Sequence, residues 1–206
     1  GLLVHDTLSA RVNPRQTGLA LAEAIRAQGG QVIIGDAEDQ GPTVHATGFA
    51  GLAALSANLG RDIGGGVKGQ AVLLAHDARG QPQLFVDALH IVPHQDGTTA
   101  IGSTSENDWQ DPTGTDARLE ALLEKARLAV PALRDAPVLD RWAGIRPRTR
   151  TRAPVLGPWP GRPGHFVANG GFKIGYGMAT KVAQVMVDLV LDDKDTIPVS
   201  FRSDAI

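Results

Sequence analysis

The sequence has no cysteine and no long apolar run, and each absence excludes a class of protein. Without thiols there is no disulfide framework, no thiolate nucleophile and no cysteine-ligated zinc or iron–sulfur centre. This composition favours a reducing compartment, and we expect a cytoplasmic protein. The longest apolar stretches, 71–75 and 185–191, are much shorter than the roughly 20 residues of a membrane-spanning helix, so we predict no membrane span. Any redox chemistry would need a bound cofactor.

Aromatic residues and an excess of one charge are also scarce. Only 4% of the residues are Phe, Trp or Tyr, and 20 Lys and Arg nearly balance 22 Asp and Glu, for a net charge of -2. Binding to nucleic acid depends mainly on basic side chains that neutralise phosphates and on rings that stack on bases. We therefore predict no nucleic-acid partner. The length of 206 residues suffices for a hydrophobic core, in one large domain or two small ones.

The first third of the chain alternates helical and extended patterns. Asn13 followed by Pro14 predicts a helix start, because Asn caps free amides and Pro fits the first helical position. Apolar residues recur at helical spacing over 14–28, and Gly29-Gly30 predicts the end of this helix. The elements predicted next are strands over 31–34 and 43–46 and a short helix over 52–59. Such alternation is typical of α/β proteins.

The pattern changes after three consecutive glycines, Gly64 to Gly66, which predict a flexible joint. Long extended segments follow, and Asp96-Gly97 between two of them predicts a hairpin, so we expect an antiparallel sheet. The elements predicted in this part are strands over 67–75, 83–92, 98–104, 138–145 and 165–168 and helices over 116–129 and 176–191. The sequence therefore predicts a mixed α/β (α+β) fold.

A glycine-rich segment, Gly170 to Gly177, lies between a predicted strand and a predicted helix. Its backbone amides could converge on an anionic or polar ligand at the helix N-terminus. The alternative is a tight connection that needs glycine only for its backbone angles. The run 175–180 imitates a dinucleotide-binding fingerprint, but Thr180 replaces the third glycine.

Four arginines, Arg146, Arg148, Arg150 and Arg152, would project from one side of an extended chain. One of them could clamp a carboxylate, because a guanidinium binds that group through two hydrogen bonds. The alternative is a solvated basic edge. His90 and His94 are four residues apart, but Pro93 favours a strand there, so we predict no metal site, while His90 alone could face a pocket.

Several segments taken in order resemble a known family. These are Trp142-Ala-Gly-Ile-Arg146-Pro147, then Pro154-Val-Leu-Gly157-Pro158, then 161–164, then a strand and the turn that ends in Phe172-Lys173-Ile174-Gly175. Together they resemble the C-terminal half of the flavin amine oxidases, in particular the D-amino-acid oxidase and glycine oxidase family. Segments 44–48, 67–70, 90–93 and 101–105 resemble further landmarks of that family in the same order, so the resemblance covers about residues 12 to 191.

The resemblance implies a fold, a cofactor and a reaction. The implied domains are a partial Rossmann-like FAD-binding domain over 1–66, an antiparallel-sheet substrate domain over 67–141, and a return segment over 142–206 that ends in a helix. Such enzymes move a hydride from the carbon bearing an amine to FAD and form an imine that water hydrolyses. The implied partner is therefore a small amine or amino acid, and oxygen commonly reoxidises the flavin.

The resemblance also assigns roles to individual residues. Arg146 matches the clamp for the substrate carboxylate, and His90, Ser105 and Lys173 match positions around the substrate. His90 stands where relatives carry Tyr, Ser105 where they carry Met and Lys173 where glycine oxidases carry Arg, which implies a more polar pocket and a substrate unlike glycine. The residues that match flavin-binding positions are Thr47, Gly48, Gly171, Phe172, Lys173, Ile174, Gly175, Tyr176 and Gly177. No catalytic acid or base is assigned.

Family members begin with a strand, a Gly-x-Gly-x-x-Gly turn and a helix, which the stretch before Val12 does not contain. The resemblance therefore implies a fragment that is inactive alone, with a missing N-terminal partner segment or a homo-oligomeric assembly. Two alternatives stay open. One is a non-catalytic α+β interaction module or subunit that has lost its cofactor, and the other is a dehydrogenase that passes electrons to a protein carrier.

Overall fold

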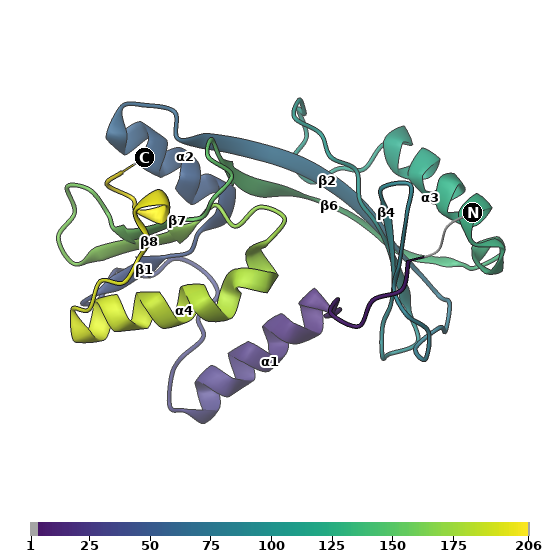
Figure 1. Cartoon of the computed structure of the whole chain (residues 1–206), viewed down its shortest axis with the longest axis horizontal. Helices are drawn as coiled ribbons and strands as arrows, with labels where there is room; N and C mark the ends of the chain where they lie inside the picture. Colours follow the sequence, from purple (N-terminus) through teal and green to yellow (C-terminus); the bar gives the residue numbers. More distant parts are fainter. Residues whose placement is uncertain (1–3, 206) are drawn as a thin grey trace. The chain divides into compact units, whose positions relative to one another are not determined.

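The computed structural model describes residues 4–205, which form two compact units (Figure 1). The first unit contains the described residues up to Ala37 together with Gln70–Thr104 and Thr115–Trp142. The second contains Glu38–Gly69, Ser105–Gly114 and the described residues from Ala143 onward. This division differs from the domain ranges 1–66, 67–141 and 142–206, which stay a prediction.

The structure contains both helices and strands, as the mixed α/β prediction requires. The helices are α1 (Pro14–Ala27), α2 (Gly48–Leu59), α3 (Ala117–Ala129) and α4 (Gly175–Asp192), with short 3-10 helices at Pro131–Leu133 and Val199–Phe201. The strands are β1 (Thr43–His45), β2 (Gly64–Leu74), β3 (Leu84–Val86), β4 (Leu89–Pro93), β5 (Thr99–Gly102), β6 (Val138–Thr149), β7 (Val155–Pro158) and β8 (His165–Asn169).

The first unit is built on antiparallel strand pairs. A five-stranded sheet has the order β3-β4-β5-β2-β6, and β2 and β6 carry residues of both units. Asp116 caps α3 by accepting a hydrogen bond from the amide of Arg118, and the buried face of α3 packs with the apolar side of the sheet. Asn13 caps α1 in the predicted way, because its side chain accepts from the amides of Arg15 and Gln16.

The second unit has a layered α/β/α arrangement. Its sheet has the order β1-β8-β7, with β1 parallel to β8 and β8 antiparallel to β7. Neighbouring strand residues point to opposite faces of a sheet. Val155 and Val167 accordingly pack with Leu52 and Leu55 of α2, whereas Leu156 packs with apolar residues of α4, so one helix covers each face (Figure 1). The carboxyl ends of β1 and β8 therefore lie at one edge, where α2 and α4 begin.

Two predictions about strands are wrong. The segment 31–34 is not a strand, and Ile33 and Ile34 are exposed. The segment 83–92 is a hairpin, because Asp87 and Ala88 both adopt positive φ and turn the chain between β3 and β4.

The three glycines are not a joint, because they begin β2. A Cβ on Gly64 would overlap with the backbone of Arg148, and one on Gly66 with the side chain of Ile145. These glycines therefore allow β2 to approach β6 closely. Strand β7 was not predicted. Among residues 4–205, no helix is long and apolar enough to cross a membrane.

Candidate functional site

Two helices of the second unit, α2 and α4, begin at the same sheet edge. Thr47 precedes α2 and Ile174 precedes α4, and within the described part of the chain neither makes a side-chain capping hydrogen bond. The first amides of a helix lack partners within the helix and carry the positive end of its dipole. In open α/β sheets, ligands bind beyond the carboxyl ends of the strands. This edge can therefore bind an anionic or polar ligand.

The turn between β8 and α4 is held tightly against its surroundings. Asn169, which is buried, donates from Nδ2 to the carbonyl oxygen of Gly48 at 2.8 Å and so joins the end of β8 to the start of α2. Gly170 has a φ of 75°, and a Cβ on Gly171 would lie 2.9 Å from the Cα of Gly175. Gly170 and Gly171 therefore present bare backbone, which both the ligand hypothesis and the tight-connection alternative require.

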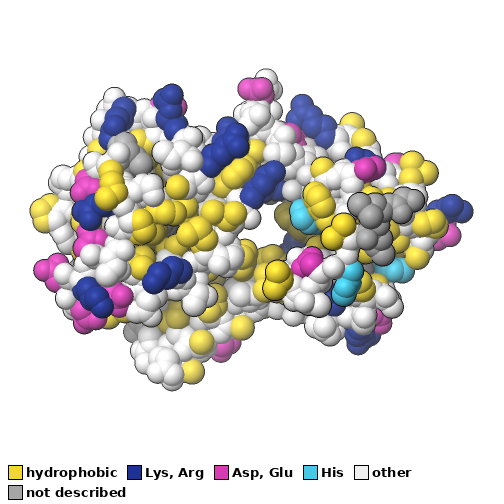
Figure 2. Space-filling model, in the orientation of Figure 1, with side chains coloured by type: hydrophobic (Ala, Val, Ile, Leu, Met, Phe, Trp, Pro, Cys, Tyr) yellow, Lys and Arg dark blue, Asp and Glu magenta, His cyan; other side chains and the backbone are white. Residues whose placement is uncertain are grey.

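An apolar cavity of about 530 Å³ opens beside this turn. Asn169, Gly171 and Gly175 contribute to its wall, and the rest is mostly aliphatic side chains of β1, β8 and α4. Figure 2 shows apolar side chains open to view on this part of the surface. A largely apolar cavity with a few polar groups at one end is typical of sites for organic ligands.

Arg146 lies on β6, with its guanidinium directly over Gly69 of β2. A Cβ at position 69 would overlap with the guanidinium, so only glycine leaves room for this arrangement. Partial burial lowers the pKa of Arg146, and the negative charge of Glu106 opposes that shift. Glu106 is itself buried and pairs through its backbone with Lys68, next to Gly69. Arg146 is thus a partly buried cation fixed on a strand.

The glycine-rich turn and β6 are connected next to Arg146. The amide of Phe172 donates to the carbonyl oxygen of Pro147 at 3.2 Å. The ring of Phe172 has two cations near it, with the guanidinium carbon of Arg148 at 5.7 Å and Nζ of Lys173 at 5.5 Å. Lys173 is exposed, and these contacts place it in the same part of the second unit as Arg146.

The other two predicted substrate residues lie in different units. Ser105 is exposed and directly precedes Glu106 in the second unit. His90 is exposed on β4 of the first unit, with its ring 4.7 Å from that of Phe85. It lines a cavity of about 440 Å³ together with Trp142 and residues of α1, β2, β4 and β5. His90 and Arg146 therefore belong to separate units.

The four arginines do not form a continuous row. Arg146 and Arg148 lie on β6, but the strand ends at Thr149, and Arg152 adopts a φ of 65° in the following turn. Arg150 instead lies 3.8 Å from a carboxylate oxygen of Asp62. The solvated-edge interpretation thus fits Arg150 and Arg152, and Arg146 stays a candidate for the carboxylate clamp.

A protein-family model matches most of the chain. The model of the FAD dependent oxidoreductase family, DAO, matches residues 1–189. The chain belongs to this family. It is 33% identical over 125 residues to a glycine oxidase of Pseudomonas aeruginosa, and the aligned region covers 60% of this chain and 34% of that protein. It is 37% identical over 135 residues to the bifunctional protein ThiO/ThiG of Synechocystis, covering 62% of this chain and 20% of that protein.

Solved structures agree with this family assignment. The glycine oxidase of Geobacillus kaustophilus matches with a TM-score of 0.66 at 30% identity, over 76% of this chain and 43% of that chain. The chain therefore spans about a third to a half of the length of these glycine oxidases. The predicted family resemblance and the mixed α/β fold class are confirmed, and FAD is the cofactor of the family.

Three residues of the candidate site can be recognised only from the three-dimensional structure. Asn169 joins two helix starts, Gly69 makes room for Arg146, and Glu106 supplies a buried charge. No local motif marks these positions, because each role depends on a partner far away in the sequence. A glycine next to a charged residue within an apolar strand was the one available signal for position 69.

Proposed function

We propose that the full-length protein is an FAD-dependent oxidoreductase that oxidises the carbon bearing the amine of an amino acid or a related amine. Bound FAD would accept a hydride from that carbon as the nitrogen loses a proton, and water would hydrolyse the resulting imine to a carbonyl compound and ammonia or an amine. Several similar proteins have names that describe oxidation of amino acids or amines. The observation that carries the proposal is the partly buried guanidinium of Arg146 in the same unit as the glycine-rich turn.

The described residues fit FAD. The starts of α2 and α4 lie at the edge where a dinucleotide binds in related folds, and the absence of side chains at Gly170, Gly171 and Gly175 leaves room for close approach. We assign cofactor contacts to Thr47 and Gly48 at the start of α2 and to 171–177 at the turn. Bound FAD supplies the electron acceptor, while the protein supplies binding, orientation and electrostatics.

Arg146 would bind and orient the substrate carboxylate. Two parallel hydrogen bonds from a planar guanidinium fix both the position and the plane of a carboxylate. Because Gly69 holds the guanidinium against backbone, little conformational entropy remains to be lost on binding. We propose supporting contacts from Ser105 and Lys173, which would make this part of the substrate site more polar than one with Met and Arg. The role of His90, which lies in the other unit, stays a prediction. Cytoplasmic localisation and homo-oligomer formation also remain proposals.

The test is a comparison of Arg146→Lys with the parent in the full-length protein. We expect the KM for carboxylate-bearing amines to rise about tenfold or more, because a charged bidentate hydrogen bond contributes roughly 1.5–3 kcal/mol. The KM for an amine without a carboxylate should stay the same. If Arg146→Lys and the parent have equal KM values for the carboxylate substrate, the clamp assignment is contradicted.

Flavin binding is tested separately by the visible absorption spectrum after addition of excess FAD and gel filtration. Retained flavin absorbance supports the cofactor assignment. A full-length protein that retains no flavin would instead support the non-catalytic module. Reduction of a dye, compared with formation of hydrogen peroxide, distinguishes a protein electron acceptor from oxygen.

A further inference from the structure

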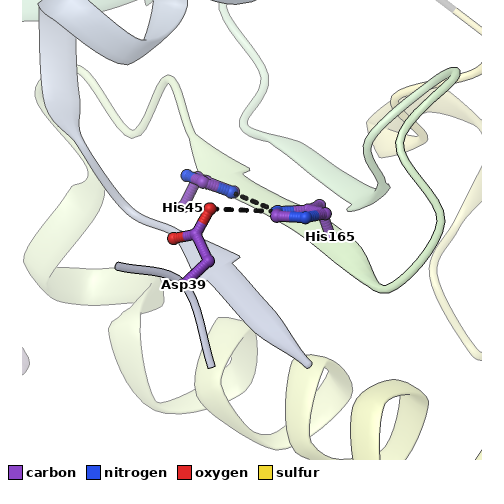
Figure 3. Close-up of side chains that lie close together, drawn as sticks. All are labelled: Asp39, His45 and His165. Carbon is purple, nitrogen blue, oxygen red and sulfur yellow. Dashed lines mark hydrogen bonds and ion pairs between the residues drawn. The ribbon is translucent and has the colours of Figure 1, made fainter. Parts of the chain in front are cut away.

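A second cluster in the second unit brings together two imidazoles and a carboxylate (Figure 3). Asp39 lies in the segment before β1, His45 ends β1 and His165 begins β8. The parallel pairing places Thr43 opposite His165 and His45 opposite Val167. Since alternate strand residues share a face, both imidazoles project from the same side of the sheet. The cluster is thus created by pairing of strands that are 120 residues apart.

The ligand atoms of this cluster have the spacing of a metal site. Nε2 of His45 lies 3.0 Å from Nδ1 of His165, and the latter lies 3.7 Å from Oδ2 of Asp39. All three ligand atoms lie within 4.8 Å of one another. Tetrahedral zinc with bonds of about 2.0–2.1 Å holds its ligand atoms roughly 3.3–3.4 Å apart. Shifts of a few tenths of an ångström would bring the two histidine nitrogens, and the His165 nitrogen and the Asp39 oxygen, to that spacing.

Neighbouring side chains hold two of the three ligands in position. The ring of His45 meets that of Trp159 edge to face at 4.9 Å, and Trp159 is fixed by a 2.9 Å hydrogen bond from its Nε1 to Asn58. Arg162 lies over the same indole and places its Nη2 3.4 Å from Oδ2 of Asp39. Such outer contacts orient ligands and raise metal affinity. The same oxygen, Oδ2 of Asp39, is thus both the candidate metal ligand and the acceptor for Arg162.

We propose that Asp39, His45 and His165 bind a divalent transition-metal ion such as Zn²⁺. Two imidazole nitrogens and one carboxylate oxygen are a common donor set for this ion, with the remaining position left for water. The ion would fasten the segment before β1 to the β1–β8 pair. This role is independent of the proposed oxidoreductase activity, and it departs from the prediction, made from sequence spacing, that the chain has no metal site.

The experiment is calorimetric titration of Zn²⁺ into metal-free, full-length protein without added flavin. We expect one ion per chain, and Co²⁺ in its place should give the absorption of a four-coordinate ion. Asp39→Asn and His165→Ala should each weaken binding by about tenfold or more. These variants are preferred to His45→Ala, which would also remove the contact with buried Trp159. Circular dichroism verifies that both variants are folded.

His5→Ala is the matched control, because His5 is exposed and belongs to the other unit. It should bind Zn²⁺ like the parent. Absence of binding up to millimolar Zn²⁺ would overturn the proposal. The same conclusion follows if Asp39→Asn and His165→Ala bind Zn²⁺ as tightly as the parent. Because flavin is omitted, failure here leaves the oxidoreductase proposal untouched.

Discussion

Gly69 shows how a residue without a side chain can set the position of a neighbouring cation, the guanidinium of Arg146. We expect Gly69→Ala to leave the fold intact, because the added methyl overlaps with the flexible end of Arg146 instead of with backbone. The displaced guanidinium should raise the KM for carboxylate substrates about tenfold, from lost charged hydrogen bonds. Steady-state kinetics of the full-length protein measures this effect.

Gly65→Ala is the control for this substitution. Gly65 lies on the same strand, and apart from its two chain neighbours no described residue has an atom within 4 Å of the position of its added Cβ. An equal change of KM in both variants would mean that any methyl on β2 perturbs the site, and would contradict the specific contact between Gly69 and Arg146.

His94 should make stability depend on pH. Its side chain is buried beside Thr98 and Asn13, and this burial lowers the pKa of His94 against the opposing charge of Asp96. The folded pKa lies below the unfolded value of about 6.5. The unfolded state therefore takes up a proton first as the pH falls, so stability is full above about pH 6.5 and declines toward the folded pKa.

The measurement is Tm as a function of pH for the parent and His94→Gln. Between about pH 7.5 and 5 the parent should lose more Tm than the variant, because glutamine does not titrate. His45, whose pKa is also lowered by burial, should leave the variant with part of the slope. Identical slopes in both proteins would show that His94 does not contribute.

At the scale of elements, α3 offers a test of the apolar stripe that predicted it. Leu119 has 0% of its surface exposed, whereas Leu128 of the same helix has 82% exposed. Leu119→Ala should lower the free energy of unfolding by about 2–5 kcal/mol through lost burial and an added cavity. Leu128→Ala should change it by less than about 0.5 kcal/mol. Urea denaturation followed by circular dichroism measures both, and equal effects would contradict this packing.

The helices could be predicted because their signals are local. The Asn13 cap and the leucine spacing of α3 lie within a few residues of the elements they define. Strands whose partner strand is distant in the sequence were harder to predict. Segment 31–34 has strand-like residues but no neighbouring strand, and β7 was missed because Pro154, Gly157 and Pro158 resemble a loop.

The residues of the candidate site also fall into those that local sequence signals could predict and those that depend on tertiary contacts. The start of α4 could be predicted within a residue, since the glycines of 170–177 mark the transition from strand to helix, whereas α2 begins at Gly48 and not at the predicted residue 52. The contact between Arg146 and Gly69 and the cluster around His45 could not, because both depend on pairing of strands distant in sequence. Local signals thus indicate where backbone is exposed to a ligand, and only tertiary pairing shows which side chains meet.

At the scale of the whole molecule, FAD should protect the two units unequally. The proposed cofactor contacts all lie in the second unit, at the first turn of α2 and at the turn that leads into α4. A ligand present at 100 times its Kd stabilises the state that binds it by about 2.7 kcal/mol. In hydrogen exchange of the full-length protein, FAD should therefore slow exchange most at 47–51 and 170–178, while α3 serves as the internal reference.

Substitutions make this experiment specific for the turn. Gly171→Ala should reduce the protection, because the added Cβ would lie 2.9 Å from the backbone of Gly175 and would force the turn to move. Gly18→Ala adds a methyl to α1 and should keep the protection, because among the described residues nothing outside the surrounding helix backbone lies within 4 Å of the added Cβ. Protection that is strongest in α3, or that survives Gly171→Ala unchanged, would place the flavin elsewhere, because backbone amides shielded by a ligand cannot exchange as fast as free ones.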